Sequence, residues 1–260
     1  MLRHLAIDPA NLARLRGPLA ERALLLDLDG TIVDIAPTPT DVRASAALLD
    51  TLARLWQLSG GALALVSGRA LADLDRIVAP LQLPAVGGHG AEFRPIAGEA
   101  ASVGCVTALD ADLKRRLKSI AELDRAILVE DKDYALALHY RQAPHQQSAI
   151  ENAVIAICTE LPPGTVEVLP GKSVVEVKAA GFNKGSAVRK LMQMPPFSGR
   201  RPIYIGDDTT DESAFAVLRE FDGVGLSVGR VLPGASAHFS TPSDVRAWLE
   251  QISKSDGLIE

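Results

Sequence analysis

The chain has 260 residues, 47% of them hydrophobic, and a formal net charge of −5 at pH 7. This length can bury the cores of one large or two modest globular domains, and the acidic balance argues against nucleic acid or an anionic membrane as a partner. Cys105 and Cys158 show no metal-ligand spacing and make no disulfide framework, so reduced thiols are expected. With no apolar leader and no segment of membrane-spanning length, a cytoplasmic enzyme is the default expectation.

The first predicted strand ends in two carboxylates. Residues 1–22 predict a leading helix that is ended by Gly17-Pro18, and the apolar run 23–26 predicts a buried parallel strand. Asp27 and Asp29 follow directly, at the sheet edge where α/β folds place their ligands. Two anions this close favour a neutralising cation, most often Mg²⁺ with oxygen ligands, although an ordinary strand end with solvated aspartates is the alternative.

Helix and strand then alternate. Residues 32–41 predict a loop over the carboxylates, residues 44–58 an amphipathic helix, and residues 62–66 a second buried strand. Ser67 ends that strand at the start of a further predicted helix, residues 70–78. Its hydroxyl and the free backbone N–H groups could bind an anion, or the serine could simply cap the helix.

A third short strand, residues 84–86, leads into a glycine-rich turn. The glycines lack the spacing of a dinucleotide fingerprint, but they permit a ligand to approach the backbone closely. His89 and Glu92 in this turn could face that ligand, or they could be the polar tips of an ordinary turn.

From about residue 98 the pattern changes to that of an inserted α+β domain. The predicted elements alternate as helix, strand, strand, helix, strand, strand: 109–123, 126–130, 134–141, 145–161, 165–169 and 173–178. Such an order packs both helices on one face of a single sheet. We therefore expect residues 98–178 to form a smaller domain inserted into the core.

Strand parity predicts a polar face on this inserted sheet. Alternate residues of a strand lie on the same side of a sheet. On the first predicted strand one side carries Ala135, Ala137, His139 and Arg141, and on the second one side carries Lys172, Val174, Glu176 and Lys178. Arg141, Lys172 and Glu176 would then lie together beside small alanines. They could hydrogen-bond the hydroxyls of a sugar, and a merely solvated sheet face is the alternative.

The remainder of the chain returns to the core. Lys184 opens a predicted helix, where a lone lysine opposes the helix dipole and is therefore expected to meet an anion. The strand 202–205 ends in a dense acidic stretch that includes Asp207, Asp208 and Asp211, and this density favours a bound cation over solvated helix caps. A last strand and helix complete an α/β, doubly wound parallel sheet (Rossmann-like) over residues 1–97 and 179–260.

Four motifs resemble, in order, those of the haloacid dehalogenase superfamily: Asp27-x-Asp29, Ser67, Lys184 and Gly206-Asp207-x-x-x-Asp211. The insertion between the second and third motifs is similar to that of the sugar-phosphatase branch. Five segments make the chain resemble the trehalose-6-phosphate phosphatases: Gly88-His89-Gly90-Ala91-Glu92, His139-Tyr140-Arg141, Gly171-Lys172-x-x-x-Glu176, Lys184-Gly185 and Gly206-Asp207-Asp208-x-Thr210-Asp211-Glu212.

This resemblance implies a phosphatase that converts trehalose 6-phosphate to trehalose and phosphate through an aspartyl-phosphate. Asp27 would be the nucleophile, and Asp29 would protonate the leaving sugar and then activate water. Mg²⁺ would be held by Asp27, the Asp29 carbonyl and Asp207. The remaining roles would be phosphate binding by Ser67 and Lys184, orientation of the metal ligands by Asp208 and Asp211, and substrate binding by His89, Glu92, His139, Arg141, Lys172 and Glu176.

Three rival functions remain at this stage. Another sugar phosphatase, for example one acting on sucrose phosphate, would keep the core and differ on the cap face. A phosphomutase would return the phosphoryl group to a sugar, so release of free phosphate separates it from a phosphatase. A non-catalytic sugar-phosphate sensor should lack the nucleophile or the acid, and both are present. We expect a monomer with no nucleic-acid or membrane partner.

Overall fold

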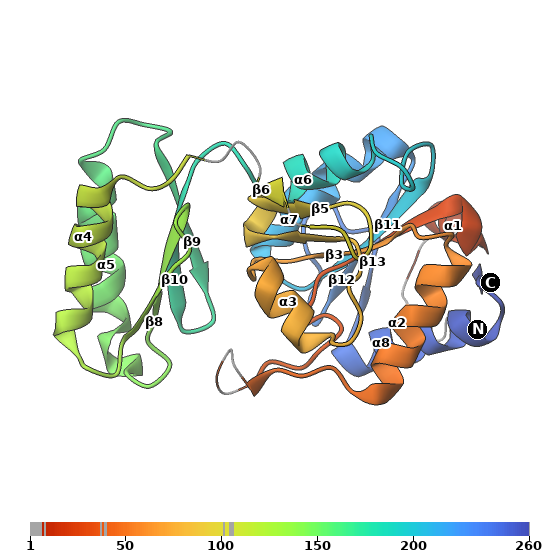
Figure 1. Ribbon diagram of the computed structural model, residues 1–260, viewed down its shortest axis with the longest axis horizontal. Helices are drawn as coiled ribbons and strands as arrows, with labels where there is room; N and C mark the ends of the chain where they lie inside the picture. Colours follow the sequence, from red (N-terminus) through yellow and green to blue (C-terminus); the bar gives the residue numbers. More distant parts are fainter. Residues whose placement is uncertain are drawn as a thin grey trace. The chain divides into compact units, whose positions relative to one another are not determined.

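The computed structural model describes residues 7, 9–36, 38, 41–100, 102–103 and 107–259 (Figure 1). The chain forms two compact units, the core unit of Met1–Gly104 with Asn183–Glu260 and the cap unit of Cys105–Phe182. These limits lie a few residues beyond the expected boundaries at 98 and 178. Strand β6 (Ser102–Val103) still pairs within the core sheet, and the Phe182 ring packs edge-on against Tyr134 of the cap unit.

An eight-stranded sheet forms the middle of the core unit, in the order β13-β12-β11-β2-β3-β4-β5-β6. The strands from β13 to β4 are parallel, whereas β5 pairs antiparallel with β4 and with β6. Their bounds are β2 Arg22–Leu26, β3 Leu63–Val66, β4 Ala85–Gly87, β5 Glu92–Arg94, β11 Arg201–Gly206, β12 Val224–Val228 and β13 Ala237–Phe239. Together with the covering helices this sheet confirms the predicted α/β class.

Alternate residues of β2 point to opposite faces of the sheet and so join two hydrophobic layers. Leu24 and Leu26 pack with one set of helices, which comprises α2 (Ala46–Leu58), α3 (Leu71–Ile77) and α8 (Pro242–Lys254). Ala23 and Leu25 pack with the other set, α6 (Lys184–Leu191) and α7 (Thr209–Val217), on the opposite side in Figure 1. Burial on both faces explains why this strand is a continuous apolar run.

The leading helix ends before Gly17-Pro18, as predicted. Helix α1 covers only Pro9–Leu15, and it is followed by the short strand β1 (Gly17–Pro18) and the 3₁₀ helix η1 (Leu19–Glu21). Gly17 has a φ of +123°, and Pro18 lacks a backbone N–H, so neither residue continues an α-helix. Strand β1 pairs instead with β14 (Leu258–Ile259). Residues 1–6 and 8 lie outside the described residues.

The cap unit contains a four-stranded antiparallel sheet in the order β7-β8-β10-β9. Helices α4 and α5 both lie on one side of this sheet (Figure 1). The elements follow the helix, strand, strand, helix, strand, strand order expected from the sequence: α4 Ala111–Ser119, β7 Leu128–Asp131, β8 Ala135–His139, α5 Gln147–Thr159, β9 Val166–Gly171 and β10 Val174–Ala179.

Among the described residues, no helix is both long enough and apolar enough to cross a membrane. Cys158 carries a free thiol, and burial raises the pKa of that thiol. Cys105 lies outside the described residues.

Candidate active site

The candidate site lies where the strand order of the core sheet reverses. From β2 the chain moves outward through β3 and β4, whereas β11, β12 and β13 extend the sheet on the other side of β2. Ligands of doubly wound sheets bind outside the carboxyl ends of the strands at such a switch point. Asp27 follows β2, Ser67 follows β3 and Asp207 follows β11, so these side chains share one edge of the sheet.

Lys184 joins two carboxylates in the interior of this site. Its Nζ donates to Asp27 Oδ1 at 2.8 Å and to Asp211 Oδ1 at 2.6 Å. The three side chains are only 3%, 6% and 0% exposed, respectively. Asn183 caps α6, so Lys184 stands in the first turn of that helix. The anions that the sequence argument required for a lysine at this position are therefore Asp27 and Asp211.

Both carboxylate oxygens of Asp211 accept hydrogen bonds. The Tyr204 hydroxyl donates to Oδ1 at 2.6 Å, in addition to Lys184, and the backbone N–H of Asp208 donates to Oδ2 at 2.9 Å. Asp208 caps α7, and its side chain also pairs with Arg230 at 3.3 Å. Asp211 is thus suited to orient its neighbours. The sequence analysis did not identify Tyr204, since a tyrosine inside a buried strand carries no local sign of such a role.

Asp27, Asp207 and Asp211 could hold a metal ion, since each offers an oxygen within 4.8 Å of the other two. A set of carboxylate oxygens suits a hard divalent cation. Asp27 and Asp207 each directly follow a strand at this sheet edge, whereas Asp211 is fully buried and accepts hydrogen bonds from Lys184, Tyr204 and the Asp208 backbone. Gly30 leaves the required space, since a Cβ there would lie 2.2 Å from Asp207 Oδ2.

The charge of this cluster is unbalanced. Burial raises the pKa of Asp27 well above its ordinary value, and the charges of Asp211 and Asp207 add to this effect, while Lys184 opposes it. Burial would lower the pKa of Lys184, but the carboxylates of Asp211 and Asp27 outweigh burial and raise it. Three carboxylates therefore face one ammonium group, and the excess of negative charge favours a bound cation.

Asp29 forms a bidentate ion pair with Arg69, which the sequence analysis did not assign. Arg69 Nε donates to Oδ2 at 2.5 Å and Nη2 donates to Oδ1 at 2.7 Å. Arg69 belongs to the turn after β3 that also contains Ser67, whose buried Oγ accepts from the Arg69 backbone N–H at 3.3 Å. The available signal was the position of an arginine three residues beyond β3, a strand that neighbours β2.

The glycine-rich turn supplies His89 and Glu92 with different surroundings. Glu92 Oε2 accepts a hydrogen bond of 2.6 Å from the backbone N–H of Leu71, the first residue of α3. This contact is structural support for the α3 terminus. His89 has a φ of +56°, and its ring lies against Gly68, where a Cβ would come within 2.4 Å of it. The imidazole therefore lies beside the Ser67–Arg69 turn.

In the cap unit, the register of β8 and β10 brings residues of the two predicted strand faces together on one side of the sheet. Glu176 stands opposite Ala137, Lys178 opposite Ala135, and Val174 opposite His139. This face carries ion pairs that the sequence analysis did not identify: Lys132 with Glu176 at 3.2 Å, His139 with Glu130 at 3.0 Å, and Lys178 with Glu167 at 2.7 Å.

Arg141 and Lys172 are not positioned by strand parity. The strand expected over 134–141 ends at His139, and Lys172 lies in the turn between β9 and β10. The guanidinium of Arg141 nevertheless donates to the Lys172 carbonyl at 3.5 Å, so the two residues are neighbours. Their proximity comes from adjoining turns rather than from a shared sheet face.

The chain is similar to trehalose phosphatases over most of its length. A family model described as trehalose-phosphatase matches residues 25–244. The chain is 38% identical over 234 residues to the trehalose-6-phosphate phosphatase of Escherichia coli (strain K12), which covers 90% of this chain and 87% of the relative. It is 39% identical to a probable trehalose-phosphate phosphatase of Sinorhizobium fredii (strain NBRC 101917 / NGR234), which covers 89% of this chain and 87% of the relative.

Solved structures share the fold. The C-terminal domain of trehalose-6-phosphate phosphatase from C. albicans gives a TM-score of 0.78 at 22% identity, with 95% of this chain and 97% of that chain covered. Trehalose-6-phosphate phosphatase of Aspergillus fumigatus gives a TM-score of 0.64 at 26% identity, with 96% and 98% covered.

Proposed function

Because this chain belongs to the trehalose-phosphatase family, its reaction is the hydrolysis of trehalose 6-phosphate, and we propose that this proceeds through an aspartyl-phosphate on Asp27. The observation that supports this assignment best is the buried constellation of Asp27, Lys184 and Asp211 at the switch point. Lys184 and the Thr31 hydroxyl, which donates to Asp27 Oδ2 at 3.1 Å, fix the orientation of the Asp27 carboxylate. A fixed carboxylate loses little freedom when it attacks phosphorus.

In the first half of the reaction, an Asp27 oxygen forms a bond to phosphorus as the bond from phosphorus to the sugar oxygen breaks. Asp29 has to be protonated at this point: it gives its proton to the departing oxygen and becomes the carboxylate that Arg69 pairs with. In the second half, Asp29 takes a proton from water, and the water oxygen displaces Asp27 from phosphorus to release inorganic phosphate. Lys184 and Ser67 would bind the phosphoryl oxygens, with Lys184 supplying the positive charge; the contact of Lys184 with Asp27 and the burial of Ser67 support this.

The donor set fits Mg²⁺, with Asp27 and Asp207 as carboxylate ligands and the Asp29 carbonyl as a third. When bound, the ion would neutralise phosphate charge and orient the phosphoryl group. Asp211 would hold Lys184, and Asp208 would hold the α7 terminus through its cap. Removal of divalent ions with EDTA should abolish turnover, and Mg²⁺ should restore it.

The cap unit would select the sugar. The candidate residues for this contact are His139, Arg141, Lys172 and Glu176. On the core unit, His89 and Glu92 are further candidates for binding the substrate. The ion pair of Glu176 with Lys132 supports this, because it holds a buried carboxylate in one place on the sheet face. The contact of Glu92 with Leu71 leaves His89 as the better candidate of the core pair.

Phosphate release from a panel of sugar phosphates tests the function. We expect Mg²⁺-dependent release that is fastest with trehalose 6-phosphate. A preference for sucrose phosphate or glucose 6-phosphate would reject this substrate while leaving the chemistry intact. Transfer to a second sugar without free phosphate would identify a mutase. A monomer in the cytoplasm remains our proposal for the working state, tested by sedimentation and by cell fractionation.

A further inference from the structure

The core unit contains a cavity at the sheet edge opposite to the candidate active site. It has a volume of about 420 Å³, and α1, the 3₁₀ helix η6 (Leu218–Phe221), β12 and the loop before β13 surround it. Gly223 and Ser236 line it, and they precede β12 and β13, respectively. Because β11, β12 and β13 are parallel, these amino-terminal ends lie across the sheet from Asp207, which follows the end of β11.

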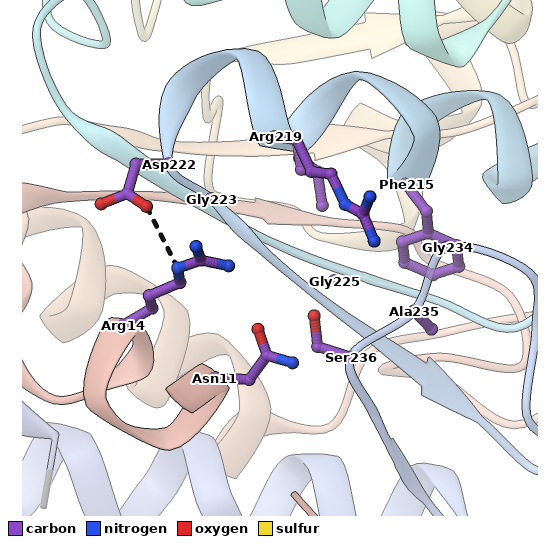
Figure 2. Close-up of a pocket in the computed structure, with 11 residues that line it drawn as sticks. Asn11, Arg14, Phe215, Arg219, Asp222, Gly223, Gly225, Gly234, Ala235 and Ser236 are labelled. Atoms are coloured by element: carbon purple, nitrogen blue, oxygen red, sulfur yellow. Dashed lines mark ion pairs between the residues drawn. The ribbon is translucent and has the colours of Figure 1, made fainter. Parts of the chain in front are cut away.

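Polar side chains from separate elements converge on this cavity (Figure 2). Arg14 and Asn11 come from α1, Arg219 from η6 and Ser236 from the loop before β13. Arg14 pairs with Asp222 at 3.2 Å, whereas among the described residues no ion pair involves Arg219. Asp222 balances one of the two guanidinium groups that line the cavity, so the lining carries a net positive charge.

The lining also indicates what the ligand is. Phe215 and Leu218 are each only 1% exposed, so they offer little apolar surface to a ligand. Gly223, Gly225 and Gly234 contribute backbone rather than side chains to the wall. The volume is within the range of small-molecule sites, and guanidinium groups favour carboxylates and phosphates through paired N–H donors.

We propose that this cavity is a second binding site, for a small polar organic anion that carries a carboxylate or phosphate group. Arg219 binds the anionic group together with Arg14, while Asn11 and Ser236 hydrogen-bond the polar body of the ligand. The site is separate from the phosphoryl site of the proposed reaction, and it does not depend on the proposed substrate.

The test is an NMR titration of the ¹⁵N-labelled full chain with Mg²⁺ present, using succinate and inorganic phosphate as probes at constant ionic strength. The backbone amides of Gly223, Gly225 and Ser236 report this cavity, whereas those of Asp207 and Lys184 report the candidate active site. We expect at least one probe to shift the cavity amides saturably, and the tighter probe identifies the anionic group. Trehalose serves as the neutral probe and should leave these amides unmoved.

Arg219→Gln is the first variant, and it should raise the Kd about threefold to tenfold, as expected for one exposed charge-assisted contact. The matched control is Arg189→Gln, because Arg189 is an exposed arginine on α6 outside the cavity lining and pairs with Glu220. It should change the Kd less than twofold. Arg14→Gln should also raise the Kd of the probe, which gives a second, independent test. Absence of saturable shifts, equal weakening by Arg189→Gln and Arg219→Gln, or equal shifts with trehalose would each overturn the proposal.

Discussion

The guanidinium of Arg69 donates to both carboxylate oxygens of Asp29, at 2.5 Å and 2.7 Å. The pair connects the turn after β3 to the turn after β2. Its two side chains are 14% and 32% exposed, so solvent screens this contact less than it would a surface pair. The planar fork of an arginine fixes the plane of a carboxylate, which a lysine does not do.

We expect Arg69→Ala to lower kcat for trehalose 6-phosphate about tenfold to a hundredfold, because a reorienting Asp29 protonates the sugar oxygen poorly. The kcat of Arg69→Lys should lie between those of the wild type and Arg69→Ala. Turnover of p-nitrophenyl phosphate should fall much less, since its leaving group departs without a proton. Equal losses with both substrates would instead show that Arg69 acts in a step that both substrates share, on the phosphoryl group or on the activation of water by Asp29.

Asp27→Asn should abolish turnover while leaving the fold intact, because the amide has the shape of the carboxylate but is not an anionic nucleophile. One of three carboxylates around Lys184 becomes neutral, so the free energy of unfolding in EDTA should hold or rise. Urea unfolding and phosphate release measure the two effects, with the exposed Asp34→Asn as control. Turnover above background would refute the nucleophile assignment.

Tyr204→Phe should destabilise the protein by about 1–3 kcal/mol, because it leaves the buried Asp211 carboxylate with one donor fewer. The packing of the ring against Phe215, at 5.5 Å between centroids, is kept. Tyr140→Phe is the matched control, since its hydroxyl lies 3.5 Å from Glu151 in a partly exposed contact. Equal changes in the two variants, measured by urea unfolding, would contradict a special role for the Tyr204 hydroxyl.

The positions of the core groups could be predicted because strand ends determine them. Asp27, Ser67 and Asp207 each end an apolar run, and parallel strands bring such ends to one edge. The pairs Arg69–Asp29 and Tyr204–Asp211 could not be predicted in this way. They depend on side-chain directions across neighbouring strands, and no local pattern encodes those directions.

The polar face of the cap unit was predicted only where its residues lie within strands. Side chains alternate between the two faces of the sheet within β8 and β10, where the register pairs Glu176 with Ala137. It fails for Lys172 because that residue forms a turn with Ser173, whose φ is +62°, and residues of a turn do not alternate between faces. The length of each strand therefore limits the prediction.

The cap unit should respond to acid through Asp131. Hydrogen bonds from Lys118, from the Asp133 backbone and from Lys114 lower the pKa of Asp131 from an ordinary 3.8 to about 2. A lowered folded-state pKa adds stability above pH 3.8, and that stability is lost as the pH falls towards 2. Asp131 is 30% exposed, so solvent screens its ion pairs, and we expect them to contribute about 0.5–1 kcal/mol to the free energy of unfolding.

Thermal unfolding of the full chain and of Asp131→Asn measures this effect. The wild type should be the more stable at pH 6, and the difference should shrink by pH 3. Asp133→Asn is the control, since Asp133 is 79% exposed and pairs only with Lys114 among the described residues. A difference that stays constant with pH would contradict the ion-pair origin.

Discrimination for the disaccharide should depend on the cap unit. A core that binds the phosphoryl group accepts almost any phosphomonoester, so preference has to come from groups that contact the sugar. Glu176→Ala and Lys172→Ala should each lower kcat/KM for trehalose 6-phosphate about tenfold to a hundredfold, since a charge-assisted hydrogen bond to a hydroxyl contributes about 1.5–3 kcal/mol. Turnover of p-nitrophenyl phosphate, which has no hydroxyls, should change little.

The ion pair of Glu176 with Lys132, at 3.2 Å, requires a further control, because Glu176→Ala also deprives Lys132 of this partner. Glu176→Gln keeps the shape of the side chain and an oxygen acceptor, so it should retain more activity than the alanine variant if a sugar hydroxyl is the contact. Lys118→Ala removes a lysine that pairs with Asp131 instead, and it should leave both substrates unaffected. Parallel losses with trehalose 6-phosphate and p-nitrophenyl phosphate would show that Glu176 stabilises the cap sheet and does not bind the sugar.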